Sequence, residues 1–310
     1  MTRVLLLGGS GTIGRATAAE LLRAAHEVRA VLRSGTVPGC EVIHADAMRD
    51  ALPLAGIDAV ICCLASRTGA PDDARAVDRD ATIAAIDAAE RAGVAQFVLL
   101  SAICVEPPVL AFHHAKLAAE ARLRASSMNW SVVRPTAFFK SLSGQVARVA
   151  EGKPFLVFGD GNLTACKPIS DRDCAAFLVD CLSDPDKRNR VLPVGGPGPA
   201  ITPMDQAAML GRLLGREVAV RRVPVALLDG VASGLSLMGR VSPRLAAKAE
   251  LARIGRFYAT RSMLVHDGDR PAPELTPEYG DDRLEDHYAA LLKGEVSDGL
   301  GAHRVFGRGT

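Results

Sequence analysis

The chain has 310 residues, of which 48% are hydrophobic and 23% charged, and its formal net charge is +2. This length predicts one large domain with an appended lobe. A near-neutral charge and an aromatic content of only 4% exclude a nucleic-acid surface, whether built on charge or on base stacking.

Strand and helix signals alternate through the first half of the chain. Short apolar runs typical of buried parallel strands lie at 3–7, 28–32, 41–43, 58–62, 96–101 and 130–133. Helical patterns separate them at 12–25, 74–92 and 112–125. Because repeated βα units build a doubly wound parallel sheet, we predict an α/β Rossmann-type domain over residues 1–150, with some later segments packing back onto it.

The pattern changes after residue 150, where Pro and Gly become dense. Short strands are predicted at 155–158 and 191–194, and helices near 171–183, 203–214, 243–256 and 281–293. These elements predict a smaller α+β lobe over residues 151–294 that binds the substrate. The glycine-rich residues 295–310 show no periodicity and are predicted to form a flexible tail.

One apolar run, residues 223–239, is shorter than a membrane-spanning helix and contains Pro224 and Asp229. We interpret it as a buried or ligand-covering helix, with peripheral contact with a membrane as the alternative. The opening MTRVLLLGG leads directly into a strand, so no signal peptide is predicted and a cytoplasmic location is expected.

A glycine-rich turn joins the first strand to the first helix. Gly8, Gly11 and Gly14 have the G-x-x-G-x-x-G spacing of the short-chain reductase superfamily in its extended and atypical branches. Such glycines allow a tight turn, close approach to a pyrophosphate, and close helix–strand packing. With the helix N-terminus, the turn predicts a dinucleotide site formed by Gly8, Ser10, Gly11, Thr12, Ile13 and Gly14. A merely structural turn is the alternative.

The end of the second strand favours NADPH over NADH. That strand ends in Arg33 and Ser34 rather than in an acid that would hold a ribose hydroxyl. A guanidinium suits a 2′-phosphate by charge and by its forked geometry, although a solvated surface arginine is the alternative. After the third strand, Asp46 is predicted either to contact the adenine or to cap a helix.

Residues that follow the later strands should also line the cofactor, because ligands bind at the carboxyl edge of such sheets. The predicted residues are Leu64, Ala65 and Ser66 after the fourth strand, Ser101 after the fifth, and Pro135, Thr136 and Phe138 after the sixth. Phe138 and its neighbour Phe139 fit an ordinary core equally well.

The helix at 112–125 carries the predicted catalytic lysine, Lys116, where the superfamily's lysine hydrogen-bonds the nicotinamide ribose. An exposed surface lysine is the alternative. The superfamily's tyrosine position is occupied by Phe112, which can donate no proton. Losing that acid disfavours carbonyl reduction but is compatible with hydride addition to a conjugated carbon–carbon double bond. His113 and His114 are adjacent in a helix, so at most one of them can point inward.

From about residue 97 to 292 the chain resembles the NADPH-dependent 8-vinyl reductases of divinyl chlorophyllide. The similar stretches are LLSAICVEPPVLAFHHAKLAAEARL, SVVRPTAFFKSLSGQV, GKPFLVFGDGNLTACKPIS, LPVGGPGPAITPMDQAAML, RVPVALLDG and EYGDD. The amino-terminal part resembles atypical, NmrA-like short-chain reductases in general. The resemblance implies reduction of the 8-vinyl group of 3,8-divinyl chlorophyllide a, or of its protochlorophyllide precursor, to ethyl. It carries no catalytic acid over to a residue of this chain.

A flat, apolar tetrapyrrole with a carboxylate at its edge would fit a cleft between the carboxyl edge of the sheet and the lobe. Lys140 and Lys167 are candidates to meet the carboxylate, with a solvated surface charge as the alternative for each. Cys166 is a candidate to shape the pocket wall, and Phe112 and Phe139 to contact the pigment. Two other functions tolerate loss of the tyrosine. One is a non-catalytic NmrA-like NADP(H) sensor, and the other is an isoflavone-reductase-like enzyme with a smaller conjugated substrate.

The cysteines predict neither a metal site nor an iron–sulfur cluster. They are Cys40, Cys62, Cys63, Cys104, Cys166, Cys174 and Cys181, without a C-x-x-C pair or metal-ligand spacing. We expect buried free thiols in a reducing compartment.

Overall fold

A computed structural model describes every residue except 48, 231–242 and 297–310. The predicted flexible tail and the second half of the apolar run 223–239 therefore lie largely outside the described residues. The chain divides into two compact units. Unit 1 contains the described residues of 1–135, 171–194 and 243–251, and unit 2 contains 136–170, 195–230 and the described residues after 251.

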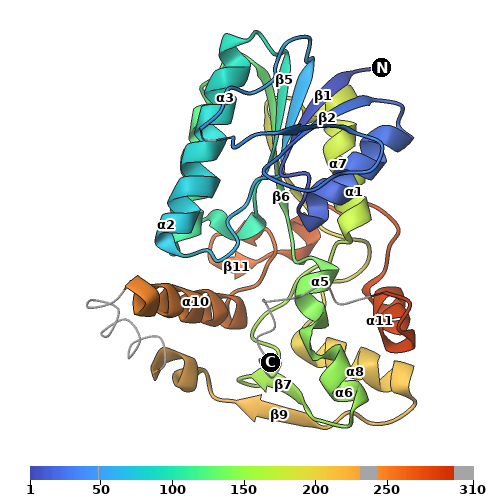
Figure 1. The fold of residues 1–310 in the computed structure, drawn as a ribbon. Coiled ribbons are helices and arrows are strands. Elements are labelled where there is room, and N and C mark those ends of the chain that lie inside the picture. Colours follow the sequence, from blue (N-terminus) through green and yellow to red (C-terminus); the bar gives the residue numbers. More distant parts are fainter. Residues whose placement is uncertain (48, 231–242, 297–310) are drawn as a thin grey trace. The chain divides into compact units, whose positions relative to one another are not determined.

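Unit 1 is built on a parallel sheet of seven strands (Figure 1). The strands are β1 (Arg3–Leu7), β2 (Glu27–Leu32), β3 (Glu41–His44), β4 (Ala59–Cys62), β5 (Gln96–Leu100), β6 (Asn129–Pro135) and β8 (Arg190–Val194). Their order is β3-β2-β1-β4-β5-β6-β8, so the winding reverses between β1 and β4. The predicted Rossmann-type doubly wound fold is confirmed, and the reversal is where such folds bind ligands.

Helices cover both faces of this sheet. One face carries α1 (Thr12–Arg23) and α7 (Asp171–Ser183), which pack together. The other carries α3 (Thr82–Arg91) and α4 (Ala111–Arg124) (Figure 1). Shorter helical pieces are α2 (Pro71–Asp73), the π-helix η1 (Ala74–Ala81), and the 3₁₀ turns η2 (Ile103–Val105) and η4 (Pro185–Lys187). The core between sheet and α3–α4 contains Leu5, Ile86, Phe97, Leu123 and Val132, each fully buried.

Two predicted elements belong to unit 1 rather than to the predicted substrate lobe. The segment 191–194 is β8, which pairs in parallel with β6, and the helix 171–183 is α7. The prediction allowed some later segments to pack back onto the first domain without saying which; these two belong to unit 1 because the chain returns to its sheet after residue 170. The boundaries of the units therefore differ from the predicted division into 1–150 and 151–294.

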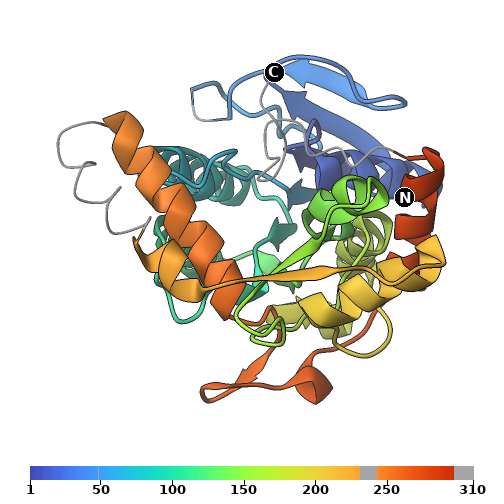
Figure 2. The same ribbon diagram turned by 90° about the horizontal axis from the view of Figure 1, so that it is seen from below.

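Unit 2 has its own core and only short strands. Its elements are α5 (Phe139–Leu142), η3 (Ser143–Gln145), α6 (Val146–Ala150), β7 (Phe155–Phe158), α8 (Pro203–Leu214), β9 (Val220–Val223), β10 (His266–Asp267), β11 (Arg270–Pro271), η5 (Pro273–Leu275) and α11 (Leu284–Lys293). Strands β7 and β9 pair in parallel, and β10 and β11 form a small hairpin, orange-red in Figure 2. Tyr288 is fully buried in the core and donates a hydrogen bond to the Leu142 carbonyl at 2.8 Å.

The remaining helix, α10 (Pro243–Thr260), contributes residues to both units. Throughout the described ranges, no helix combines the length and the apolar character that crossing a membrane would require.

Candidate active site

The turn after β1 requires glycine at two positions. Gly8 has a φ of +78°, and a Cβ there would lie 2.5 Å from the Cys63 carbonyl oxygen. A Cβ on Gly14 would lie 2.1 Å from the Gly8 carbonyl oxygen, so α1 packs directly on the turn. The N-cap residue Gly11 has no side chain to cap α1, and the first turn of α1 has no acidic residue. An anion would therefore be a favourable cap, as the predicted pyrophosphate site requires.

Beside this turn, Arg33 and Ser34 follow directly after β2 and are exposed. Arg33 forms no ion pair with any described residue. Asp46 begins a turn in which its backbone N–H donates to the Asp50 carboxylate at 2.7 Å. No helix begins there in the described chain, so the alternative of a helix cap is not supported.

Lys116 is not a surface residue, so that alternative was wrong. Its Nζ lies 3.1 Å from Oδ1 of Asp78, and the two side chains are 13% and 1% exposed. Asp78 lies on the π-helix η1, which packs against α4. Its other oxygen accepts the Ser66 N–H at 3.3 Å, in the segment of Leu64, Ala65 and Ser66 that follows β4. Asp78 lies in the helical pattern predicted at 74–92, but no feature of that pattern marks it as the partner of Lys116.

The ion pair lies near the thiol of Cys62. Cys62 ends β4, and burial raises the pKa of its thiol to about 11. The Lys116 charge lowers that pKa and the Asp78 charge raises it, by smaller amounts. Both charges therefore lie close to the carboxyl end of β4, the strand that flanks the winding reversal.

Ser101 is engaged in a second buried network. Its hydroxyl donates to Glu120, which is 2% exposed and also accepts from Arg134 at 2.5 and 3.2 Å. Arg134 also pairs with Glu106 at 3.1 Å. Glu120 and Arg134 were missed by the sequence analysis because charged residues in a helix and a strand are usually solvated.

Three consecutive residues in the first turn of α4 differ in burial, as helix geometry requires. Phe112 is half-buried, His113 is fully buried and His114 is exposed, so only one histidine points inward, as predicted. The rings of Phe112 and His113 meet edge to face with centroids 4.3 Å apart. Nδ1 of His113 accepts the Val109 N–H at 3.3 Å.

Pro135 is the buried last residue of β6 in unit 1, and several of the other predicted residues lie in unit 2. Thr136 is buried, and half-buried Phe138 forms a parallel bridge with Ile169. Phe139 packs in the core of unit 2 with Tyr288, which favours the packing interpretation for Phe139. Lys140, in α5, is half-buried.

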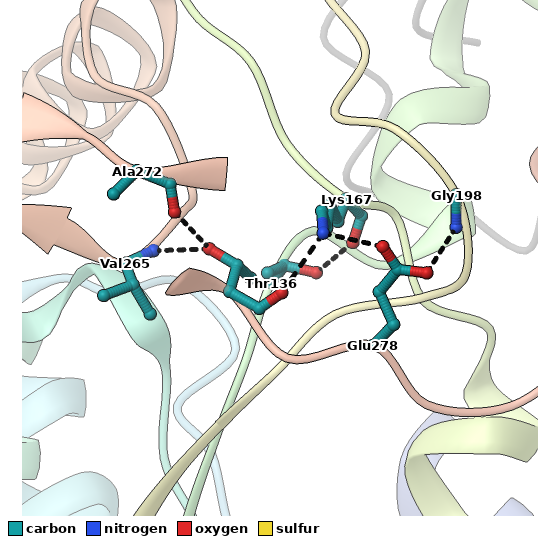
Figure 3. Close-up of polar contacts among 7 residues, drawn as sticks. Thr136, Lys167, Gly198, Val265, Ala272 and Glu278 are labelled. Atoms are coloured by element: carbon teal, nitrogen blue, oxygen red, sulfur yellow. Dashed lines mark hydrogen bonds and ion pairs between the residues drawn. The ribbon is translucent and has the colours of Figure 1, made fainter. Parts of the chain in front are cut away.

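Lys167 is buried and forms an ion pair with the exposed Glu278 within unit 2. Its Nζ lies 2.8 Å from Oε1 of Glu278 and donates to the Thr276 carbonyl at 3.2 Å (Figure 3). The other Glu278 oxygen accepts the Gly198 N–H at 3.0 Å. The hydrogen bond from Lys167 lowers the pKa of Glu278, and the Gly198 N–H adds to this effect. Lys167 would have to release Glu278 to meet a substrate carboxylate.

All seven cysteines are free, and six are buried. No group of three or more potential metal ligands occurs in the described parts of the chain. Burial raises the pKa of Cys63 and Cys166 to about 12. At pH 8 only about one such thiol in ten thousand is ionised, so reaction with a thiol reagent should be slow.

We therefore expect the half-buried Cys40 to be modified first in the native protein and the other six only on unfolding. Timed modification with iodoacetamide at pH 8, followed by peptide mass spectrometry with and without urea, measures this. Rapid native labelling of Cys63 or Cys166 would contradict the buried placement. Since no cluster of metal ligands occurs among the described residues, an iron chelator should leave activity unchanged.

Comparison with known proteins identifies what the chain is similar to. The model of a family described as NAD(P)H-binding matches residues 8–185. The chain is 45% identical to the chloroplastic divinyl chlorophyllide a 8-vinyl-reductase of Oryza sativa subsp. indica, over 98% of this chain and 82% of that protein. It is 41% identical to the protein of the same name from Arabidopsis thaliana, over 94% of this chain and 76% of that one.

Among solved structures, the fold is similar to that of the NADPH-dependent quinone oxidoreductase of Escherichia coli complexed with NADPH. The TM-score is 0.67 at 18% identity, covering 93% of this chain and 99% of that one. At this level of identity the similarity concerns the fold alone.

Proposed function

The chain belongs to the divinyl chlorophyllide a 8-vinyl-reductase family, and we propose that it reduces the 8-vinyl group of 3,8-divinyl chlorophyllide a, or of its protochlorophyllide precursor, to ethyl with NADPH. The observation that carries the proposal is similarity to reductases of that name over nearly the whole chain. The substrate is accordingly a tetrapyrrole.

The residues of unit 1 fit the cofactor. Gly8 and Gly14 leave no room for a Cβ, and Gly11 opens a helix whose N-terminus favours an anion, so this turn would hold the pyrophosphate. Lys116 would hydrogen-bond the nicotinamide ribose and fix its orientation. When bound, NADPH supplies a hydride from C4 of its nicotinamide.

The residue at position 112 fits the proposed reaction. Reduction of a ketone needs an acid beside the developing alkoxide, and Phe112 has none to offer. A vinyl group on a tetrapyrrole is conjugated with the macrocycle, which delocalises the negative charge that hydride addition creates. The phenyl ring therefore needs only to pack beside the site.

The assay that tests the function is direct. Purified protein with NADPH should shift the Soret band of divinyl chlorophyllide to shorter wavelength, and mass spectrometry should show a gain of two hydrogens. NADPH binding without any change in the pigment would refute the proposal and favour a sensor. Turnover of a smaller conjugated substrate alone would favour an isoflavone-reductase-like enzyme.

Arg33 is proposed to select NADPH. Replacing it by aspartate removes an ion pair to the 2′-phosphate and adds a repulsive charge, which should cost about 2–4 kcal/mol in NADPH binding. We expect KM for NADPH to rise and the relative use of NADH to improve. Arg188→Asp is the matched control, because Arg188 is exposed and precedes β8, at the opposite edge of the parallel sheet. An unchanged preference for NADPH in Arg33→Asp would show that the phosphate is held elsewhere.

Peripheral contact with a photosynthetic membrane also belongs to the proposal. Its support is the apolar run 223–239, in whose described part Leu227 is 58% exposed. A single exposed leucine is common on protein surfaces, so the apolar composition of the run carries this interpretation.

A further inference from the structure

Lys116, the predicted catalytic residue, forms a buried ion pair with Asp78. The sequence analysis had not assigned Asp78 to any site. Both charges are withdrawn from solvent, with side-chain exposures of 1% and 13%. Such a pair contributes little to stability, because desolvation offsets much of the attraction. A role in stability alone therefore accounts poorly for an aspartate at this position.

Asp78 also fixes a second element of unit 1. While Oδ1 faces Lys116 on α4, Oδ2 accepts the N–H of Ser66 in the segment after β4. That segment begins beside Cys63, whose carbonyl oxygen leaves no room for a Cβ on Gly8. One buried carboxylate thus connects the lysine to the loop that adjoins the glycine turn.

The backbone that carries Asp78 is unusual. Residues Ala74–Ala81 form a π-helix, a conformation that is rare and that occurs frequently at functional sites. The hydroxyl of Thr82 donates to the Val77 carbonyl at 3.1 Å, at the end of this segment. The same segment contains a second aspartate, Asp80, whose side chain is 44% exposed and forms an ion pair with the adjacent Arg79. Two aspartates on one helical segment therefore occupy opposite environments.

We propose that Asp78 is a positioning residue for hydride transfer, which acts by holding Lys116 and the Ser66 loop in one fixed geometry at the carboxyl edge of the sheet. The inference rests on the proposed role of Lys116 at the nicotinamide ribose. Asp78 itself touches neither the cofactor nor the pigment in this role. Removing its charge would leave the lysine free to turn toward solvent, and the ribose would lose its fixed partner.

The test compares Asp78→Asn with the matched control Asp80→Asn. Asparagine retains an acceptor for the Ser66 N–H and removes only the charge that holds Lys116. In single-turnover reduction of divinyl chlorophyllide at saturating NADPH, Asp78→Asn should slow the reaction about thirtyfold, since small misplacements of reacting groups cost up to about a hundredfold. The dissociation constant of NADPH, measured by titration with NADPH fluorescence as the signal, should rise by less, about fivefold. Asp80→Asn should change neither quantity by more than about twofold.

Non-additivity with Lys116 separates positioning from a general loss of structure. In a Lys116→Gln background, adding Asp78→Asn should change the single-turnover rate by less than about twofold, because the residue acts through the lysine. That double variant leaves no charge unpaired, so it remains testable if Asp78→Asn alone does not fold. The proposal would be overturned if the fold-loss in rate of the double variant equalled the product of the fold-losses of the two single variants. So would a folded Asp78→Asn with a lower Tm but the parent's rate and NADPH affinity.

Failure of the proposed function gives a different result. If the parent protein does not reduce the vinyl group, the proposed function is wrong. The affinity of the variants for NADPH then tests whether Asp78 positions Lys116. In that case the inference would be overturned if Asp78→Asn bound NADPH with the parent's affinity while Lys116→Gln bound it more weakly.

Discussion

Lys116→Ala is expected to slow single-turnover vinyl reduction about a hundredfold at saturating NADPH, with a smaller loss in cofactor affinity. The physical reason is that the nicotinamide ribose loses its proposed partner, so the approach of the hydride is no longer fixed. The change also leaves the carboxylate of Asp78 buried without its ion-pair partner, at 1% side-chain exposure. Breaking a buried pair in this way costs about 3–5 kcal/mol of stability, so the rates must be compared well below the Tm of the variant.

Phe112→Tyr is the companion variant. A hydroxyl there would supply no proton that hydride addition requires, so the rate should stay within about tenfold of the parent, or about 1.4 kcal/mol of barrier. If Lys116→Ala proved silent while His113→Ala abolished turnover at an unchanged Tm, the chemistry would have to be placed at the histidine. His114→Ala, at the exposed neighbour, controls for the substitution itself.

Gly14→Ala should have the other large effect. The added methyl group would lie 2.1 Å from the Gly8 carbonyl oxygen and 2.8 Å from the Gly9 Cα, both backbone atoms that cannot rotate away. Helix α1 would have to move off the turn, at a cost of about 1–3 kcal/mol or more in stability. We expect NADPH affinity to fall by about a hundredfold or more, because the helix N-terminus would no longer face the pyrophosphate.

Gly255→Ala is the matched control for Gly14→Ala. Gly255 lies in α10 with nothing within 4 Å of a Cβ, so the same substitution should raise the free energy of unfolding by up to about 1 kcal/mol. Thermal unfolding and NADPH titration of both variants measure the contrast. Parental NADPH affinity in Gly14→Ala would mean that the cofactor does not use this turn.

The features predicted correctly are those with local causes. Apolar runs such as 3–7 and 96–101 form buried strands, and the spacing of Gly8, Gly11 and Gly14 required a turn between a strand and a helix. The prediction that at most one of His113 and His114 faces inward is confirmed, because neighbouring residues of a helix point in different directions.

The features that were missed depend on partners far away in the sequence. The segments 171–183 and 191–194 were recognised as a helix and a strand, but no local pattern shows that they join the first sheet. Strand β9 was not predicted, because its sequence VRRV has two exposed arginines where an apolar run would be expected.

The same limit applies to the ion pairs. Lys167 was predicted to face the substrate, but it contacts Glu278, 111 residues later in the chain. A lone lysine carries no signal that distinguishes a ligand-binding residue from half of an ion pair. Asp78 was missed for a similar reason: the helical pattern at 74–92 was recognised, but nothing in it marks Asp78 as the partner of Lys116 on α4.

The interleaving of the two units has a consequence for synthesis on the ribosome. Helix α7 and strand β8 are made only after the 136–170 segment of unit 2, so the sheet of unit 1 cannot be completed when Pro135 emerges. At about 5–20 residues per second, the stretch from Thr136 to Val194 takes roughly 3–12 s to translate. During that interval the nascent chain exposes the edge of β6 and the face of α1 that α7 later covers. A binding factor that shields apolar surface would act in this window, and slow codons within 136–194 would lengthen it.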